Sequence, residues 1–413
     1  MTMKPAALED LRILELADES GQHCGKLFAD MGANVIKIEK PGGDDARRVG
    51  PFLNDIPDPN RSLFFWHYNT SKKGITLNLE TVDGREILKK LVKTADVILE
   101  TFPPGHLNQL GLGYPILREI NPKLIMTSLT PFGQTGPYKQ YKSSDLVSLA
   151  LGGPMNSCGY DDIPGVPPIR GGGNQGYQTG GHYAFIGTLI ALIYRQMTGR
   201  GQYIDASAHE ALACTTEFST ISYFYIQRLV KRQTGRHASL QDTGNNDCLC
   251  KDGRWAKIYG FRDEAAWDAL VEWMESEGMA GDLKDEQYKN PAYRTEENEH
   301  IMELINAFAQ HHTSEEFWEK AKPKGTVIGF PIRSPEEMAE DPHHKSRGFT
   351  FEVEHPELGK TFKYPGSPYL FHGTPWRITR RAPLIGEHNE EIYMGELGFT
   401  KVELTMLAEG EVI

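Results

Sequence analysis

Cysteine is scarce in this sequence, and long apolar runs are missing. The five cysteines among 413 residues are odd in number and scattered, which indicates a reducing compartment rather than a disulfide framework. Cys248 and Cys250 are separated by one residue, which is too close for the usual pair of zinc ligands, so we predict no metal site. No apolar run reaches the ~20 residues of a membrane helix, and the amino terminus shows no charged-then-apolar signal segment. We therefore expect a cytoplasmic protein.

Basic residues are also in the minority. Lys and Arg number 44 against 56 Asp and Glu, which gives a net charge of −12. This balance argues against a nucleic-acid surface, because such a surface needs clustered positive charge. The hydrophobic content of 39% is ordinary for a globular protein, and the length allows a sizeable core divided among two or three domains.

The first part of the sequence alternates short apolar strands with amphipathic helices. Units of this kind predict a parallel sheet with right-handed crossovers, so we expect an α/β, Rossmann-like large domain. The turn after the first strand, residues 17–21, is not a Gly-x-Gly-x-x-Gly turn, and nicotinamide cofactors are therefore not expected. Ser20 is the expected cap of the first helix. Strands are predicted at 11–16, 35–38, 96–99, 124–129 and 203–205, helices at 83–94, 183–197, 207–231 and 387–397, and a loop at 145–180.

Changes in this pattern indicate the domain boundaries. Residues 1–231 form the predicted large domain, which residues 376–413 complete, and the polar residues 232–248 form a linker. From 249 to 334, hairpin-like strands and amphipathic helices indicate a smaller α+β domain. The proline-containing stretch 335–375 is the expected return linker. The expected core of the smaller domain contains Trp267, Trp273, Phe308 and Trp318.

Short motifs follow one another along nearly the whole chain. The most specific is Arg170-Gly-Gly-Gly-Asn-Gln-Gly176-Tyr177, which a helix and Thr198-Gly-Arg-Gly-Gln202 follow. In kind and order the motifs resemble those of the class III (formyl-CoA transferase-like) CoA-transferases. This resemblance implies two subunits interlocked like chain links, each a ring formed by the two domains and their two long linkers. The other motifs lie at 11–16, 20–21, 30–42, 69–73, 100–105, 121–125, 132–138, 250–253 and 382–388.

Tyr177 stands where the resemblance implies the nucleophile of the family. The family carries an aspartate directly after the glycine at 176, and this carboxylate attacks the acyl-CoA thioester to form an anhydride. A phenol has a pKa of about 10 and does not readily replace a carboxylate in that step. No Asp or Glu occurs between Asp162 and Asp205, so we expect no catalytic residue in this chain. The alternatives are an unfamiliar tyrosine nucleophile and a misaligned motif.

The resemblance also implies a CoA pocket in which several basic residues have changed. Lys40 replaces an arginine that meets the CoA phosphates, Glu80 replaces a lysine, and Gln109 stands where many relatives have an arginine. Because contacts with phosphate are charge-assisted, we expect CoA binding to be weakened or lost. Glu19 either adds a negative charge near the thioester or caps the next helix. The residues expected to border this degenerate pocket are Glu19, Ser20, Lys40, Leu77, Asn78, Thr101, Phe102 and Lys142.

Three hypotheses on function follow. The first is a non-catalytic subunit of a heteromeric class III CoA-transferase, whose homologous partner carries the missing aspartate. Its expected reaction moves CoA from succinyl-CoA to an organic acid, with (R)-benzylsuccinate of anaerobic toluene degradation as the expected acid. The second is a homodimeric protein that binds a CoA ester without turnover. The third, a 2-methylacyl-CoA racemase, needs a histidine before Asp145 and an aspartate near 177, where Ser144 and Tyr177 stand, so it is disfavoured.

Overall fold

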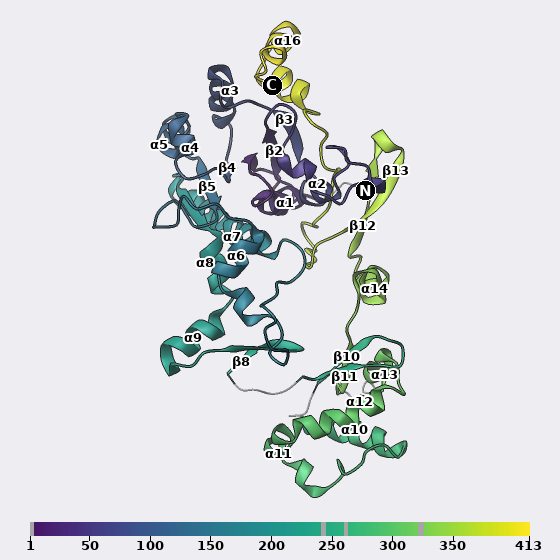
Figure 1. Cartoon of the computed structure of the whole chain (residues 1–413). Coiled ribbons are helices and arrows are strands. Elements are labelled where there is room, and N and C mark those ends of the chain that lie inside the picture. The colour runs from purple at the N-terminus through teal and green to yellow at the C-terminus, as the bar shows by residue number, and fades with distance from the viewer. Residues whose placement is uncertain (1–3, 241–244, 260–262, 321–325) are drawn as a thin grey trace. The chain divides into compact units, whose positions relative to one another are not determined.

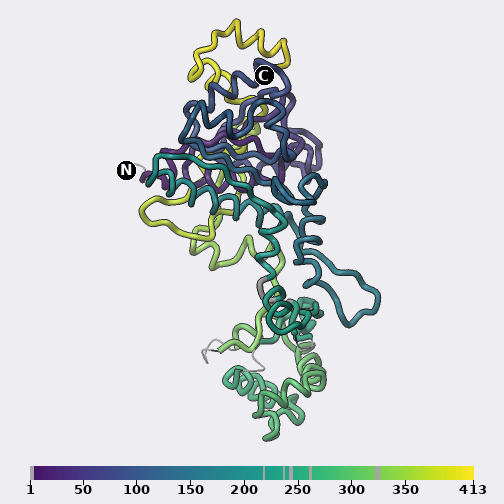
Figure 2. Tube along the Cα trace, turned by 90° about the vertical axis from the view of Figure 1, so that its left-hand side faces the viewer, coloured from purple at the N-terminus to yellow at the C-terminus, as the bar shows by residue number. Residues whose placement is uncertain are grey.

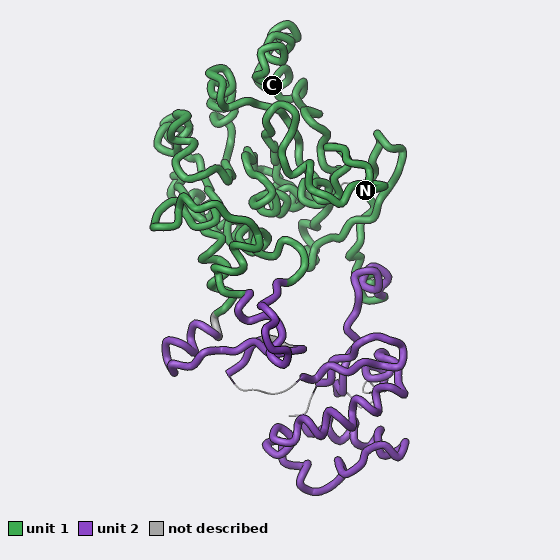
Figure 3. Tube along the Cα trace, in the orientation of Figure 1, with its two compact units in different colours: residues 1–154, 171–216, 342–413 green, residues 155–170, 217–341 purple. Residues whose placement is uncertain are grey.

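The chain forms two compact units (Figure 1, Figure 3). The computed structural model describes residues 4–240, 245–259, 263–320 and 326–413. Unit 1 comprises residues 1–154, 171–216 and 342–413, and unit 2 comprises residues 155–170 and 217–341. Each unit is therefore built from segments that are distant in the sequence.

A six-stranded sheet forms the centre of unit 1. Its strands pair in parallel in the order β3-β2-β1-β4-β5-β6, so the order reverses between β1 and β4. Strands β1 to β5 are buried on both faces, which explains why they read as apolar runs in the sequence. The predicted α/β fold with a parallel sheet is confirmed. The strands are β1 (Arg12–Leu16), β2 (Asn34–Glu39), β3 (Lys73–Thr76), β4 (Val97–Glu100), β5 (Ile125–Thr130) and β6 (Tyr203–Ser207).

Helices cover both faces of this sheet. Successive strand residues point to opposite faces, so Leu14 packs with residues of α3 and α5, whereas Ile13 packs with residues of α1 and α7. The helices of unit 1 are α1 (Gln22–Asp30), α2 (Leu63–Tyr68), α3 (Val82–Val92), α4 (His106–Gln109), α5 (Tyr114–Ile120), α6 (Asp145–Leu151), α7 (Gln175–Thr198), α8 (Ala208–Cys214), α15 (Pro342–Ser346), the π-helix η7 (Glu390–Glu396) and α16 (Lys401–Glu409).

The carboxyl-terminal segment returns to the sheet beside β3. The Tyr393 hydroxyl donates to the carbonyl of Thr76 at 2.5 Å, and the Asn78 N–H donates to the carbonyl of Val412 at 2.7 Å. Figure 2 shows this segment, in yellow, next to the purple and blue amino-terminal part. The predicted helix 387–397 is the shorter η7. Helix α16 was not predicted, although its capping box of Thr400 and Glu403 is legible in the sequence.

The region predicted as a loop contains α6 and the first two turns of α7. Helix α7 begins at Gln175 rather than near 183, because a carboxylate from α6 caps it. Asp145 Oδ1 accepts hydrogen bonds from the N–H groups of Gly176 at 2.8 Å and Tyr177 at 3.2 Å. An acceptor from another helix cannot be recognised by the local capping rules that the sequence offers.

Unit 2 contains a three-stranded antiparallel sheet in the order β11-β10-β9, packed with helices around one core. Trp267, Trp273 and Phe308 are buried in this core as predicted, whereas Trp318 is half-buried and Phe317 takes the core position on α13. The predicted helix 207–231 is divided between α8 and α9. The elements of unit 2 are α9 (Glu217–Ile226), β7 (Lys231–Gln233), β8 (Arg236–Ser239), β9 (Asp247–Leu249), β10 (Trp255–Ile258), α10 (Glu264–Ser276), α11 (Pro291–Glu296), α12 (Asn298–Ala309), α13 (Ser314–Glu319), β11 (Gly329–Pro331) and α14 (Pro335–Glu340).

Both stretches predicted as linkers contain regular structure. The first, 232–248, includes β8, and its residues 241–244 lie outside the described residues. The second includes α14, α15 and the hairpin of β12 (Thr350–His355) and β13 (Lys360–Pro365). The Phe362 ring of this hairpin lies 5.4 Å from the ring of Trp66, so the hairpin packs with the rest of unit 1 rather than only passing along it.

Candidate functional site

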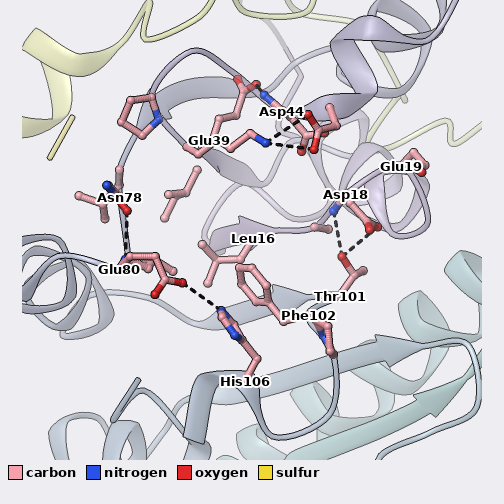
Figure 4. A pocket seen from close by; sticks show the side chains of 18 of the residues that line it. Leu16, Asp18, Glu19, Glu39, Asp44, Asn78, Glu80, Thr101, Phe102 and His106 are labelled. Carbon is pink, nitrogen blue, oxygen red and sulfur yellow. Dashed lines mark hydrogen bonds and ion pairs between the residues drawn. The ribbon is translucent and has the colours of Figure 1, made fainter. Parts of the chain in front are cut away.

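A pocket of about 860 Å³ lies at the carboxyl ends of β1, β2, β3 and β4 (Figure 4). The residues that directly follow each of these strands line it, and the order of the strands reverses at this place. Doubly wound α/β proteins bind their ligands at such a reversal. The volume is also that of a small-molecule site. The pocket is therefore the candidate site of unit 1.

One wall of this pocket is apolar because it belongs to the core. Leu16 and Ile38 stand at or near the ends of their strands, and Leu77 and Leu79 follow β3. All four are buried in one hydrophobic cluster, against which Phe102 packs. The wall thus offers an apolar surface beside polar loop residues.

The remaining lining is acidic. The side chain of Lys40 is exposed, and its Nζ lies 3.0 Å from Asp45 Oδ2. His106 Nε2 lies 3.7 Å from Glu80 Oε1 (Figure 4). The positive charge of Lys40, which an anionic ligand could use, is therefore already shared with a carboxylate. The acidic residues that line the pocket are Asp18, Glu19, Glu39, Asp44, Asp45, Glu80 and Glu411.

Two of these carboxylates are paired with buried cations behind the pocket. Glu39 accepts from Arg47 Nε at 2.6 Å and from Arg47 Nη2 at 2.7 Å. Lys37 Nζ donates to Asp44 Oδ2 at 3.1 Å. Burial alone would raise the pKa of Asp44, but Lys37 and the N–H of Ala46 hold that pKa below its usual value. The charges of Glu39 and Asp44 are thus compensated within the fold.

The loop between β1 and α1 is organised by Asp18. Its Oδ1 accepts from the Ser20 N–H at 3.0 Å, from the Ser20 hydroxyl at 2.6 Å and from the Thr101 hydroxyl at 3.0 Å. The N-cap of α1 is Gly21, and no side chain caps this helix. The prediction that Ser20 caps α1 is therefore wrong, because Asp18 holds its hydroxyl. Glu19 does not cap α1 either, and burial followed by the charge of Asp18 raises its pKa.

Most of the residues predicted for the pocket lie in it, but Ser20 and Lys142 do not line it. Lys142 is exposed in the loop before α6. The sequence analysis did not predict Asp18 and Asp44 as pocket residues. Both follow closely after strands, and this position could have indicated that they lie at the pocket. It could not have found Glu411, because only the tertiary return of the carboxyl-terminal segment brings this residue to the pocket. The predicted residues that do line it are Glu19, Lys40, Leu77, Asn78, Thr101 and Phe102.

Tyr177 lies in the first turn of α7, where its side chain is half-buried. Burial, and then the nearby charges of Glu19 and Asp18, raise the pKa of its phenol to about 12. The phenol is therefore protonated at neutral pH. The carboxylate of Asp145 is engaged with the amides of α7 and caps the helix. The first turn of α7 thus presents a neutral hydroxyl beside an acidic loop.

A family model described as CoA-transferase family III matches residues 8–389. The chain belongs to this family. Subunit BbsE of succinyl-CoA:(R)-benzylsuccinate CoA-transferase from Thauera aromatica is 34% identical to it over 401 residues, which cover 96% of this chain and 95% of that one. Formyl-CoA:oxalate CoA-transferase from Streptomyces coelicolor is 31% identical, with 100% of both chains covered. A CAIB/BAIF family protein from Brucella suis has a similar structure, with a TM-score of 0.82 at 27% identity, over 95% of this chain and 100% of that one.

Enzymes of family III use CoA thioesters as substrates, so the pocket at the strand ends is the place to consider for such a ligand in this chain. Within the described ranges, no three His, Cys, Asp or Glu side chains are grouped as they would be around a metal ion. Among the helices of the same ranges, none is long and apolar enough to cross a lipid bilayer.

Proposed function

We propose that this chain is the non-catalytic subunit of a heteromeric family III CoA-transferase, working in the cytoplasm with a homologous subunit that carries the nucleophilic aspartate. The observation that carries the proposal is Tyr177 at the start of α7. Its pKa of about 12 keeps the phenol protonated at neutral pH, and a protonated phenol is a weak nucleophile toward a thioester. Glu19, another carboxylate near Tyr177, stands in the loop after β1, outside the motif on α7.

The charge of the pocket supports the same proposal. CoA carries several phosphate charges, and the lining that would meet them contains more carboxylates than basic groups. Lys40 is held by Asp45, and Glu80 adds a negative charge near the adenine-side residues Leu77 and Asn78. Like charges facing one another weaken binding. The CoA thioester is therefore proposed to bind in the partner subunit, and this pocket is proposed to be a degenerate copy.

The proposed reaction moves CoA from succinyl-CoA to an organic acid, and (R)-benzylsuccinate is the proposed acid. The support is the 34% identical relative, which is named as a subunit of an enzyme with these substrates. Succinyl-CoA is also the donor named for the D-citramalate enzyme of Chloroflexus aurantiacus, which is 33% identical over 99% of this chain. The donor thus has broader support than the acceptor.

An exposed apolar stripe on α7 supports a partner subunit. Ile186, Ile190 and Ile193 are 50%, 60% and 58% exposed, and their spacing places them on one side of the helix. Apolar stripes of this kind in a chain without its partner mark protein–protein contact. We assign the contact to the proposed homologous subunit, with the two chains interlocked through the predicted rings.

The test is co-expression with a homologous subunit that has Gly-Asp at the position of Gly176-Tyr177. Native mass spectrometry gives the composition of the assembly, and CoA transfer from succinyl-CoA is assayed on each species. We expect transfer only by the mixed assembly, with loss of activity when the partner's aspartate is replaced by asparagine. Transfer by this chain alone, at a rate similar to that of the mixed assembly, contradicts the proposal.

The same samples test the second hypothesis, a homodimer that binds a CoA ester without turnover. The pocket volume is the observation in its favour. A stable homodimer that takes up stoichiometric CoA and forms no mixed assembly would support it. The racemase hypothesis gains no support from the structure, because Ser144 serves as the N-cap of α6 and Tyr177 is not ionised at neutral pH.

A further inference from the structure

Two histidines join α1 to α7 in unit 1. His23 Nε2 on α1 lies 3.2 Å from His182 Nε2 on α7, and the ring centroids are 4.6 Å apart. The helices approach closely here because α7 carries Gly181, where an added Cβ would lie 3.3 Å from the backbone nitrogen of Cys24. His182 is exposed, whereas His23 is half-buried. A hydrogen bond between two imidazoles, which the proposed CoA chemistry does not use, therefore spans the contact between these helices.

This hydrogen bond suits only the neutral form of both rings. A neutral imidazole has one N–H donor and one acceptor, whereas an imidazolium has two donors and no acceptor. His23 Nδ1 is shielded from solvent and makes no hydrogen bond with any residue in the described ranges. A protonated His23 would therefore carry a buried N–H at Nδ1 without an acceptor. A protonated His182 would have to donate to His23 Nε2, which moves the proton of His23 to Nδ1 and leaves the same unpaired donor. Either protonation thus carries the cost of an unsatisfied buried group.

The surroundings of His23 also oppose a positive charge on its ring. Burial, followed by four basic groups, lowers the pKa of His23 to about 3. Each of these groups disfavours a second positive charge close to it. In the order of their effect, they are His182, His67, Lys26 and Lys72.

The carboxylates next to the two lysines are already paired. Lys26 Nζ lies 2.7 Å from Asp30 Oδ2, and Lys72 Nζ lies 2.7 Å from Glu15 Oε2. On α2, burial and then the charge of Lys26 lower the pKa of His67 to about 4. A proton on an imidazole of this group would therefore be a partly buried charge without a counter-charge of its own, which is costly.

Helix α2 also meets the pair through Tyr68. The Tyr68 ring lies edge to face with the ring of His23 at 5.9 Å, and its hydroxyl accepts from Gln178 Nε2 at 2.8 Å. Burial raises the pKa of this phenol, and Asp145 on α6 raises it further against the hydrogen bond from Gln178. Tyr68 therefore stays neutral over the pH range in which a histidine titrates.

We propose that the His23–His182 pair is an acid-sensitive latch between α1 and α7. The latch is closed while both rings are neutral, and it opens when either ring takes up a proton, because the exposed His182 then turns to solvent. Helix α1 follows residues 17–19 of the candidate pocket, and the first turn of α7 carries Tyr177. Opening the latch therefore loosens the support of both segments. This assignment does not depend on whether the pocket binds CoA.

The latch weakens as the pH falls. An unfolded chain binds a proton at His23 below about pH 6.5, whereas the closed latch does so only near pH 3. The stabilisation is therefore complete above pH 6.5 and is lost as the pH falls from there toward 3. Between pH 7.5 and 5, His23 alone should raise the equilibrium constant of opening by about 30-fold. Glu100 acts in the opposite direction on the whole fold, because burial raises its pKa to about 7.

The test is hydrogen–deuterium exchange of the full chain at pH 7.5 and pH 5, read by mass spectrometry on peptides from α1 and from the first turns of α7. Exchange rates are corrected for the intrinsic pH dependence of amide exchange. Helix α3, which packs on the other face of the sheet, is the internal reference. His23→Gln removes the titrating ring and keeps a polar side chain that can bond to His182. His372→Gln changes an exposed histidine and is the matched control. Glu100 is present in all three proteins, so its effect cancels in the comparison.

We expect opening of α1 and of the first turns of α7 to rise by at least about 30-fold from pH 7.5 to pH 5 in the wild type and in His372→Gln, and opening of α3 to change far less. In His23→Gln the rise should be smaller by about that factor. The proposal is overturned if α1 keeps its protection at pH 5, or if α3 loses protection to the same extent. It is also overturned if His23→Gln has the pH dependence of the wild type. Circular dichroism checks that each variant is folded, and should His23→Gln fail to fold, the comparison of α1 with α3 in the wild type still decides.

Discussion

Glu80 provides a direct test of the proposal that the acidic lining of this pocket weakens CoA binding. The carboxylate lines the pocket beside Asn78, and its side chain is 69% exposed, so solvent screens its charge. Two unit charges 4 Å apart in water interact by about 1 kcal/mol, and Glu80→Lys turns such a repulsion into an attraction. The change in binding free energy is therefore roughly 2 kcal/mol, which corresponds to about a 30-fold lower Kd for CoA.

The assay is calorimetric titration of CoA into the wild type and the variant at low ionic strength and again near 0.15 M salt. The gain in affinity should shrink at the higher salt concentration, because the Debye length falls to about 8 Å. Glu119→Lys makes the same change of charge at an exposed position on α5 and serves as the control. If Glu119→Lys increases CoA affinity as much as Glu80→Lys does, only net charge matters and a phosphate position near Glu80 is refuted.

Three further predictions follow from the pocket and its support. Glu39→Gln removes the charge that compensates the buried Arg47 and should lower the free energy of unfolding, measured by urea denaturation, by about 3–5 kcal/mol. Asp45→Asn breaks the exposed Lys40–Asp45 ion pair instead and should lower this free energy by less than ~1 kcal/mol. Tyr177→Phe in the mixed assembly should leave the rate of CoA transfer unchanged; a large loss would instead identify Tyr177 as a participant. Asp44 has a lowered pKa in the folded state, so its stabilisation is present above its unfolded-state pKa of about 3.9 and is lost as the pH falls through the folded-state value. Asp44→Asn should therefore flatten the acid limb of stability against pH, and an unchanged limb would contradict this.

The parts of the fold that depend on local patterns could be predicted from the sequence. Strands β1, β2, β4 and β5 were located to within one or two residues because each is a short apolar run between helices. The start of α7 could not be predicted, because its cap is Asp145, about 30 residues earlier in the chain.

The site was predictable to a similar extent. Residues next to strand ends, such as Leu77 and Thr101, reach the pocket by topology alone. The acidity of the pocket was only partly visible, because it depends on which carboxylates are compensated. Glu39 is neutralised by Arg47, a pair that sequence spacing does not reveal. A further cavity of unit 1, lined by residues of β4, β5, β6, α4 and α5, could not be inferred at all, because only the fold brings these elements together.

The presence of a pocket is not itself evidence that a ligand binds there. Its apolar wall consists of Leu16, Ile38, Leu77 and Leu79, which are buried in the core of the sheet. These residues would be needed for stability even in a subunit that has no catalytic activity. The loops at the strand ends are free of that constraint, and there the acidic residues are concentrated. The shape of the pocket therefore depends on the core of the sheet, whereas its charge depends on the loops. Shape comparison alone would assign CoA to this pocket, whereas the response of CoA affinity to Glu80→Lys measures the property that decides binding.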